Sequence, residues 1–179
     1  MPLVAWKSAE VNIRIEQASG DVFSALRTIE LASFETLRAA GAVAGEAAAS
    51  SDEELQRYLD SGFLLAAFGE GGVPVGYGGG YVANGWLHIG EVDVHPNWQR
   101  KGIGRRLLEA LLDEGRTRKL RGATLTTDRF APFNAPFYTS LGFQAVEEEA
   151  CPARLRAILD KEKEKGLDPL RRVAMMLGF

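Results

Sequence analysis

Residues 85–112 read GWLHIGEVDVHPNWQRKGIGRRLLEALL and place an apolar strand, a glycine-containing turn and an amphipathic helix in immediate succession. Within the strand, Leu87 and Ile89 share one parity, whereas Val92 and Val94 share the other. Side chains alternate between the two faces of a sheet, so a parity shift indicates one extra residue, a β-bulge. A central strand covered on both faces would give a similar pattern, and the sequence leaves both interpretations open. A bulge would splay this strand from its neighbour and open a slot in the sheet.

The turn after this strand has the composition of an anion site. Gly102 and Gly104 stand where the strand gives way to the helix, and glycine lets backbone N–H groups approach a ligand closely. The first four N–H groups of a helix lack internal partners, and the helix dipole adds partial positive charge, so this terminus suits a phosphate. A purely structural turn with cations on a solvated face remains the alternative. A P-loop is excluded because GxxxxGK[ST] is missing, and a Rossmann fingerprint because Leu107 replaces its third glycine.

Hydrophobic periodicity around this segment predicts a mixed α+β order. The turns EGG and ANG join three strands into an antiparallel meander, and the strand–helix–strand order after it predicts a parallel pair with a right-handed crossover. Ser51 and Glu54 have the spacing of a capping box. The expected strands are residues 11–16 (with Val11, Ile13 and Ile15 on one face), 63–69, 73–83, 85–94, 123–128, 143–148 and 171–177; the expected helices are residues 21–40, 51–60, 102–120, a short one within 131–142, and a charged, solvent-exposed one within 151–166.

Composition narrows the class of protein. The chain has 179 residues, which predicts a single domain, and its net charge of −3 gives no reason to expect nucleic-acid binding. One cysteine, Cys151, excludes an internal disulfide, and two histidines, His88 and His95, make a protein zinc site unexpected, so we expect no metal. No apolar run reaches the roughly 18 residues of a membrane span, and residues 1–16 lack the pattern of a signal peptide, so we expect a cytoplasmic protein without a membrane partner.

The turn resembles a known motif once its flanks are included. Residues 94–111 resemble the acyl-CoA-binding motif of the GCN5-related N-acetyltransferases (the GNAT superfamily), written [QR]-x-x-G-x-[GA]. Gln99, Gly102 and Gly104 match its fixed positions. Downstream, NAPFYTSLGF at residues 134–143 resembles the second part of the signature, in which Asn and Tyr precede Leu-Gly-Phe. The resemblance covers residues 63–146 in the order of elements.

The resemblance implies a fold and a reaction. The fold would be a GNAT-like α+β domain spanning residues 1–179, with a mostly antiparallel central sheet splayed at a β-bulge and flanked by helices. The reaction would be transfer of an acetyl group from acetyl-CoA directly to a primary amine of a small molecule or peptide, in a ternary complex. Homodimers are frequent among such proteins. The alternative is a non-catalytic acyl-CoA-binding sensor; a generic nucleotide-phosphate binder fits the antiparallel meander poorly.

The resemblance also assigns roles to residues of this chain. The CoA arm would lie beside Val92 and Val94, the Val94 N–H would polarise the thioester carbonyl, and Asn134 would touch the arm. The turn would hold the pyrophosphate through its backbone amides and basic side chains, which involves Gln99, Arg100, Lys101, Gly102, Ile103, Gly104 and Arg105.

Two side chains are candidates for the chemistry. Tyr138 would lie near the sulfur as general acid, and Glu91 would act as base on an ammonium whose pKa is about 10.4. Each has a structural alternative, a core aromatic for Tyr138 and a sheet salt bridge for Glu91. We expect Asp93 to point to the opposite face from Glu91, and Asp128 is a third acidic candidate for the acceptor pocket.

Other reactive side chains are assigned no role, and the acceptor is only outlined. His88 and His95 are expected as turn or surface residues and Cys151 as a bystander. The acceptor would be selected by residues 23–61 and the loop 130–136, where acidic residues hint at a cationic amine without naming it.

Overall fold

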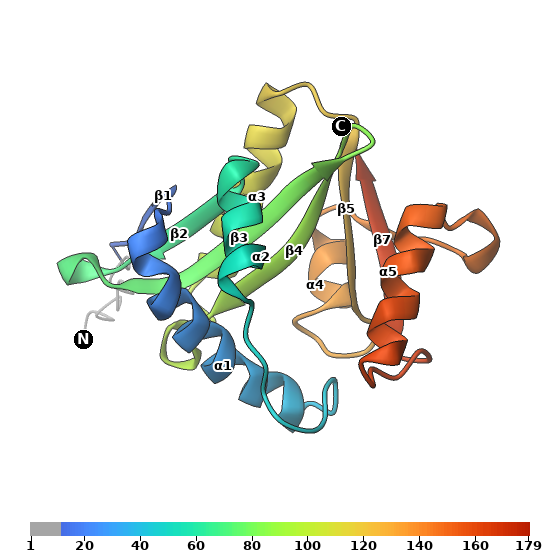
Figure 1. Cartoon of the computed structure of the whole chain (residues 1–179), viewed down its shortest axis with the longest axis horizontal. Coiled ribbons are helices and arrows are strands. Elements are labelled where there is room, and N and C mark those ends of the chain that lie inside the picture. The colour runs from blue at the N-terminus through green and yellow to red at the C-terminus, as the bar shows by residue number, and fades with distance from the viewer. Residues whose placement is uncertain (1–11) are drawn as a thin grey trace, which may run out of the picture.

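Residues 12–179 are described by the computed structural model, which folds them into one seven-stranded sheet with helices on both faces (Figure 1). No helix in this range has the length and apolarity needed to cross a membrane. The strands are β1 (Arg14–Gln17), β2 (Leu64–Phe68), β3 (Pro74–Ala83), β4 (Trp86–Val94), β5 (Gly122–Asp128), β6 (Gln144–Ala145) and β7 (Arg172–Gly178); the helices are α1 (Phe23–Ala39), α2 (Asp52–Asp60), α3 (Ile103–Thr117), α4 (Ala135–Ser140) and α5 (Ala153–Glu164).

The elements follow the predicted order, with local differences at their ends. The first strand begins at Arg14, and Val11 lies outside the described residues. The strand expected over 143–148 is reduced to the two residues of β6. The capping box at α2 is confirmed, because the Ser51 hydroxyl accepts from the Glu54 N–H and the Glu54 carboxylate accepts from the Ser51 N–H.

The sheet has the order β1-β2-β3-β4-β5-β7-β6, and every neighbouring pair is antiparallel except β4 and β5. The predicted parallel crossover through α3 is therefore confirmed. Two residue pairs join β4 to β5, Leu87 with Ala123 and His88 with Thr124. Beyond His88 the two strands have no further ladder pairs, and this opens a slot in the middle of the sheet.

The predicted β-bulge is confirmed at Gly90. Gly80 pairs with Ile89 while Gly79 pairs with Glu91, so Gly90 is the extra residue on β4. After the bulge the parity changes, and Val92 stays on the side of the sheet where Ile89 already packs.

Asp93 is two residues from Glu91, on the same side of the bulge. The two side chains therefore share a face, and the expectation that they point in opposite directions was wrong.

Glycines in β3 allow α2 to lie close to the bulged strand. A β-carbon on Gly79 would lie 2.3 Å from the Tyr58 ring, and one on Gly90 would lie 2.1 Å from the Tyr58 hydroxyl. On the other face, a β-carbon on Gly78 would lie 2.8 Å from Leu111 of α3. The glycine run of β3 therefore accepts a helix on each side of the sheet.

The two faces of the sheet carry different helices. Figure 1 shows α1, α2 and α5 in front of the sheet and α3 and α4 behind it. Behind, the leucines of α3 pack with β4, β5 and α4 in the largest apolar cluster. In front, α1 and α2 pack on β2 and β3, whereas α5 packs on β7 in a separate cluster. The slot between β4 and β5 lies between the regions that these front helices cover.

Candidate active site

A cavity of about 850 Å³ follows the slot between β4 and β5. One end is formed by residues 98–105, apart from Lys101, which make up the turn after β4 and the first residues of α3. The other end is formed by α1, by the last turn of α5 and by the start of β7. The residues that the sequence predicted for cofactor and catalysis thus face one continuous cavity, with the exception of Lys101.

The turn at the first end exposes backbone amides to the cavity. Gly102 is the N-cap of α3 with φ of 77°, and Arg100 also has a positive φ of 60°. Nothing lies within 4 Å of a β-carbon built on Gly102, and only the Val94 side chain, at 3.7 Å, lies near one on Gly104. The first intrahelical bond runs from the Arg106 N–H to the Gly102 carbonyl, at 3.1 Å. The open space in front of unpaired helix amides has the chemistry of a phosphate cradle.

The basic side chains of the turn have different partners. Arg105 donates to the Ser140 hydroxyl at 3.1 Å and lines the cavity. Arg106 donates to the Ile13 carbonyl at 2.8 Å and so ties the helix to the chain before β1. Lys101 lies over the Trp98 ring, 4.9 Å from its centroid, and does not line the cavity.

The end of β4 turns one backbone amide toward the slot. The His95 N–H donates to the Val75 carbonyl at 2.9 Å, on the β3 side. Successive N–H groups alternate along a strand, so the Val94 N–H points to the opposite side, toward the slot. The Gln99 side chain donates to the Val94 carbonyl at 3.0 Å, which fixes the turn relative to this strand end.

Asn134 and Tyr138 enter the cavity from the start of α4. The Asn134 amide donates to the Thr127 hydroxyl at 2.9 Å, while its carbonyl Oδ1 is buried without a partner among the described residues. Tyr138 is buried against Phe143, and burial, followed by the nearby Asp93 and Glu91 carboxyls, raises the pKa of its hydroxyl. Tyr138 therefore keeps its proton at neutral pH.

Two carboxyl groups form the β4 wall of the cavity. Burial raises the pKa of Glu91 well above its ordinary value, and the Asp93 and Glu30 carboxyls raise it further. Burial also raises the pKa of Asp93, to about 6. Glu30 lies behind this wall. Its carboxylate accepts hydrogen bonds from the Ser50 N–H, the Ser50 hydroxyl and the Tyr77 hydroxyl, at 2.9 to 3.0 Å.

Asp128 does not belong to the cavity. It is buried and accepts two hydrogen bonds from Arg171, at 2.7 and 3.0 Å, and two from the backbone N–H groups of Phe130 and Ala131. Burial alone would raise the pKa of Asp128, but these hydrogen bonds outweigh burial and lower it. Asp128 anchors the loop between β5 and α4 to the start of β7, so its candidacy for the acceptor pocket was wrong.

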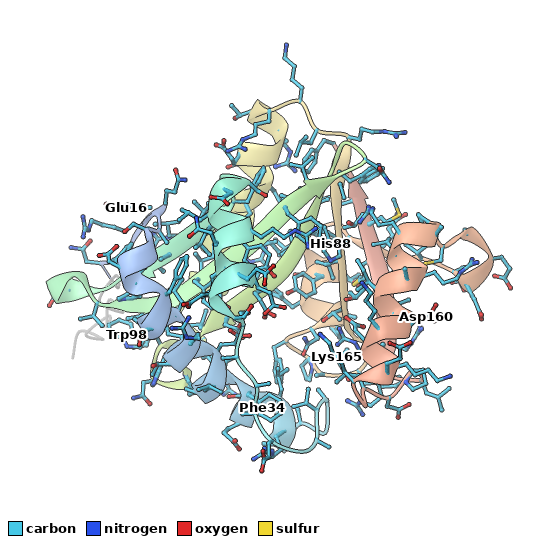
Figure 2. The ribbon with its side chains drawn as sticks, viewed as in Figure 1. Glu16, Phe34, His88, Trp98, Asp160 and Lys165 are labelled. Carbon is cyan, nitrogen blue, oxygen red and sulfur yellow. The ribbon has the colours of Figure 1, made fainter. Side chains whose placement is uncertain are left out.

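The histidines and the cysteine lie outside the cavity wall. His88 is not the expected turn or surface residue: it is buried, with Nδ1 3.1 Å from the Thr124 hydroxyl, and burial, then Arg154 and Arg57, lowers its pKa to about 4. Figure 2 shows His88 on the front face, between α2 and α5. His95 accepts from the Asn97 N–H at 3.2 Å, as a turn residue does. Cys151 is buried with α5 and β7.

Part of the cavity wall was not predicted from the sequence. Ser33 and Thr36 of α1 face the cavity, inside the region expected to select the acceptor. Lys165, at the end of α5 (Figure 2), and an ion pair between Glu162 and Arg172, at 3.0 Å, form the far wall. The sequence indicated only a charged, exposed helix here, because its distance from the slot depends on how β7 enters the sheet.

The chain is similar to known acetyltransferases in sequence and in fold. The profile described as "Acetyltransferase (GNAT) family" matches residues 24–143. Among solved structures, the ribosomal-protein-S18-alanine N-acetyltransferase of Escherichia coli is 20% identical over 93% of each chain, with a TM-score of 0.65. The PaiA N-acetyltransferase of Thermoplasma acidophilum, solved with coenzyme A, is 15% identical over 93% of this chain and 99% of its own, with a TM-score of 0.70. A GNAT family acetyltransferase of Brucella melitensis, solved with acetyl-CoA, is 23% identical over 74% and 83%, with a TM-score of 0.52. At these identities the structural similarity shows a common fold.

Proposed function

The chain belongs to the GNAT acetyltransferase family, and from this premise we propose that it transfers an acetyl group from acetyl-CoA to a primary amine of a small molecule or peptide. One observation carries the proposal. The cavity leads from the amide cradle at the start of α3, through the slot beside β4, to the two carboxyl groups of Glu91 and Asp93. A phosphate-bearing acyl donor and a cationic acceptor would therefore meet inside the slot.

The residues present fit acetyl-CoA. The cradle is open at Gly102 and Gly104, where a pyrophosphate would accept from the amides of residues 102–105. The unpartnered Oδ1 of Asn134 is an acceptor for an amide N–H of the pantetheine arm. The structures from Thermoplasma acidophilum and Brucella melitensis contain coenzyme A and acetyl-CoA, which supports the same donor for this chain.

Glu91 prepares the acceptor. An alkylammonium with a pKa of about 10.4 must lose a proton before it can attack, which costs roughly 4.6 kcal/mol at pH 7. A carboxylate whose pKa is raised by burial and by neighbouring acids is a better base than an exposed one, and Glu91 is in this situation. The base acts on the amine directly or through one water.

Val94 and Tyr138 assist the transfer itself. The Val94 N–H points into the slot, where it would polarise the thioester carbonyl. The nitrogen–carbon bond forms as the carbon–sulfur bond breaks, Tyr138 gives its proton to the sulfur, and the nitrogen returns a proton to Tyr138. The ammonium therefore loses two protons in all. The first ends on the Glu91 carboxylate, and the second reaches the thiol by way of Tyr138. Direct transfer needs no covalent acyl-enzyme.

The test is acetyl-CoA turnover with a panel of amines, followed by release of free thiol, together with calorimetric titration of CoA. Glu91→Gln should lower kcat at least 100-fold while CoA affinity changes less than threefold. Glu149→Gln is the matched control, because Glu149 is exposed and outside the cavity wall. If CoA binds, no amine stimulates thiol release and Glu91→Gln changes nothing, the chain is an acyl-CoA sensor and the proposal fails.

A further inference from the structure

Asp93 is a buried carboxyl group with an unsatisfied oxygen at the cavity wall. The residue is 8% exposed, and its Oδ2 atom has no hydrogen-bond partner within residues 12–179. Because Gly90 is the bulged residue, Asp93 and Glu91 stand two positions apart on the same face of β4. The wall therefore presents two neighbouring carboxyl groups rather than the single one expected of a general base.

The polar side chains around this pair are mostly carboxyl groups and tyrosine hydroxyls. Neither carboxyl has an ion-pair partner in the part of the chain that the structure describes. On the far wall, Arg172 is already bound by Glu162, while Lys165 lines the cavity across from the pair and has no ion pair among the described residues. The groups that face the pair from each packed element are Glu30 and Ser33 of α1, Glu54 and Tyr58 of α2, Tyr77 of β3 and Tyr138 of α4.

An unpaired carboxylate in such surroundings is costly. Burial without a partner costs several kcal/mol in general, and a folded chain keeps such a group when something else supplies the missing donor. Ser33 and Glu91 lie beside Asp93, yet Oδ2 remains without a partner. A cation with several N–H donors would satisfy both carboxyl groups at once.

We propose that Asp93 and Glu91 bind the acceptor's ammonium as one carboxylate pair, with Asp93 as its direct partner, and that the pair selects primary amines without a carboxylate on the neighbouring carbon. The inference rests on the proposed function, since it concerns the acceptor of that reaction. A primary ammonium has three donors, enough for both carboxyl groups. A carboxylate on the adjacent carbon would be held against the two like charges of Asp93 and Glu91, neither of which has an ion-paired cation within residues 12–179. Simple alkylamines, lysine side chains and peptide N-termini fit this wall, whereas free α-amino acids do not.

The carboxyl pair can also accept the proton that the ammonium must lose before it attacks. The ammonium gives one proton to the carboxylate pair, which then holds a single proton between Asp93 and Glu91, and the neutral amine is left to attack. After the transfer the pair releases this proton to water and returns to its starting charge. Asp93 thus touches the reacting nitrogen and shares the proton that the base removes.

The selectivity is tested with matched acceptors that differ by one group. Isopentylamine, leucine and leucine amide form one series, and 2-phenylethylamine, phenylalanine and phenylalanine amide form the other. We expect kcat/KM for each amine to exceed that of its amino acid about 50-fold, and the neutral amide to recover most of the loss. A ratio below tenfold in both series, or an amide as poor as the amino acid, overturns the inference.

The role of Asp93 is tested with Asp93→Asn, which keeps the shape and removes the charge. We expect kcat/KM for the amines to fall at least tenfold and the discrimination against amino acids to shrink below tenfold. The unfolding midpoint should stay equal or rise, because a buried unpaired charge has been removed. Asp113→Asn on the exposed side of α3 is the control and should change neither. Unchanged amine kinetics in Asp93→Asn overturn the inference.

A binding measurement separates failure of the inference from failure of the proposed function. Isopentylammonium is titrated calorimetrically into the CoA-saturated protein and into its Asp93→Asn variant. If the amine binds to the wild-type protein and not to the Asp93→Asn variant, the carboxyl pair binds the ammonium even if no acetyl transfer is found. If the wild type and Asp93→Asn acetylate amines equally well, the proposed function is supported and the inference about Asp93 is wrong.

Discussion

Replacing Gly104 separates the two roles of the turn between β4 and α3, which are helix geometry and ligand contact. Gly104 is the second residue of α3 and has no positive φ, and a β-carbon there would meet only Val94, at an ordinary 3.7 Å. Gly104→Ala therefore fits without displacement. Alanine is favoured over glycine by about 1 kcal/mol within a helix, and about half of this in the first turn. For a chain of this size, that gain raises Tm by roughly 1 to 2 °C.

Valine at the same position should leave stability near that of the wild type but weaken coenzyme A binding. Its lower helix propensity cancels most of the gain over glycine. Its two methyl groups extend into the open space in front of the α3 amides, where the pyrophosphate would lie. One lost hydrogen bond to a charged group costs about 1.5 to 3 kcal/mol, which corresponds to a 10- to 150-fold weaker Kd. Alanine, which the motif [QR]-x-x-G-x-[GA] accepts, should change Kd by less than threefold.

Thermal unfolding followed by circular dichroism and calorimetric titration with CoA measure the two effects on the same samples. The expected pattern is a small rise in Tm with an unchanged Kd for Gly104→Ala, and an unchanged Tm with a weakened Kd for Gly104→Val. If Gly104→Val binds CoA as tightly as the wild type, the cradle does not hold the pyrophosphate. A drop in Tm for Gly104→Ala would contradict the structure, in which a β-carbon at this position meets no close contact.

Three further outcomes are expected. Tyr138→Phe should lower kcat 10- to 100-fold with little change in Tm, because it removes the general acid and leaves the ring packing intact; equal kcat would remove Tyr138 from the mechanism. Burial raises the pKa of Asp93 to about 6 against about 3.9 in an unfolded chain, so the folded state binds the extra proton between these values. The free energy of unfolding should therefore fall by about 2 kcal/mol as pH rises from 4 to 7, and urea titrations of Asp93→Asn should lack this component. Asp128→Asn should destabilise by about 1 to 3 kcal/mol through the lost charge on Arg171 while CoA affinity stays the same; a weakened CoA complex would return Asp128 to the site.

The features predicted from the sequence are those encoded over short distances. The parity shift between Ile89 and Val92 located the bulge within one residue, because alternation along a strand is a local property. The two glycines of the α3 turn predicted an amide cradle for the same reason, since helix termini carry their own unpaired donors. The hairpin signals and the strand–helix–strand order then predicted the neighbours of β4.

The acceptor end of the cavity depends on contacts that the sequence does not encode locally. Glu162 and Lys165 reach the cavity because β7 enters between β5 and β6 and carries the end of α5 to the slot. Asp128 looked like a cavity carboxylate at the end of a strand, but Arg171, 43 residues later, binds it. Asp93 is a different case: it follows Glu91 by two residues and both lie beyond the bulge at Gly90, so local alternation alone places the two side chains on one face, contrary to the expectation.

The same acids support opposite proton transfers at the two sides of the slot. Asp93 and Glu91 raise the pKa of the Tyr138 hydroxyl, so that it keeps its proton until a thiolate needs it. They also raise one another's affinity for a proton, so that the pair accepts one from the ammonium. An ammonium bound between them weakens both effects by its charge. Transfer of its proton onto the pair leaves the total charge of amine and pair unchanged, so the effect on Tyr138 returns only when the pair releases that proton to water. The empty pair therefore keeps Tyr138 protonated, and binding of the ammonium makes the Tyr138 hydroxyl a stronger proton donor to the sulfur. The acid limb of the kcat profile should shift to lower pH in Asp93→Asn, because Glu91 loses a negative neighbour, and should stay in place in Tyr138→Phe, which removes a neutral group; an unchanged acid limb in Asp93→Asn would show that the two carboxyl groups titrate independently.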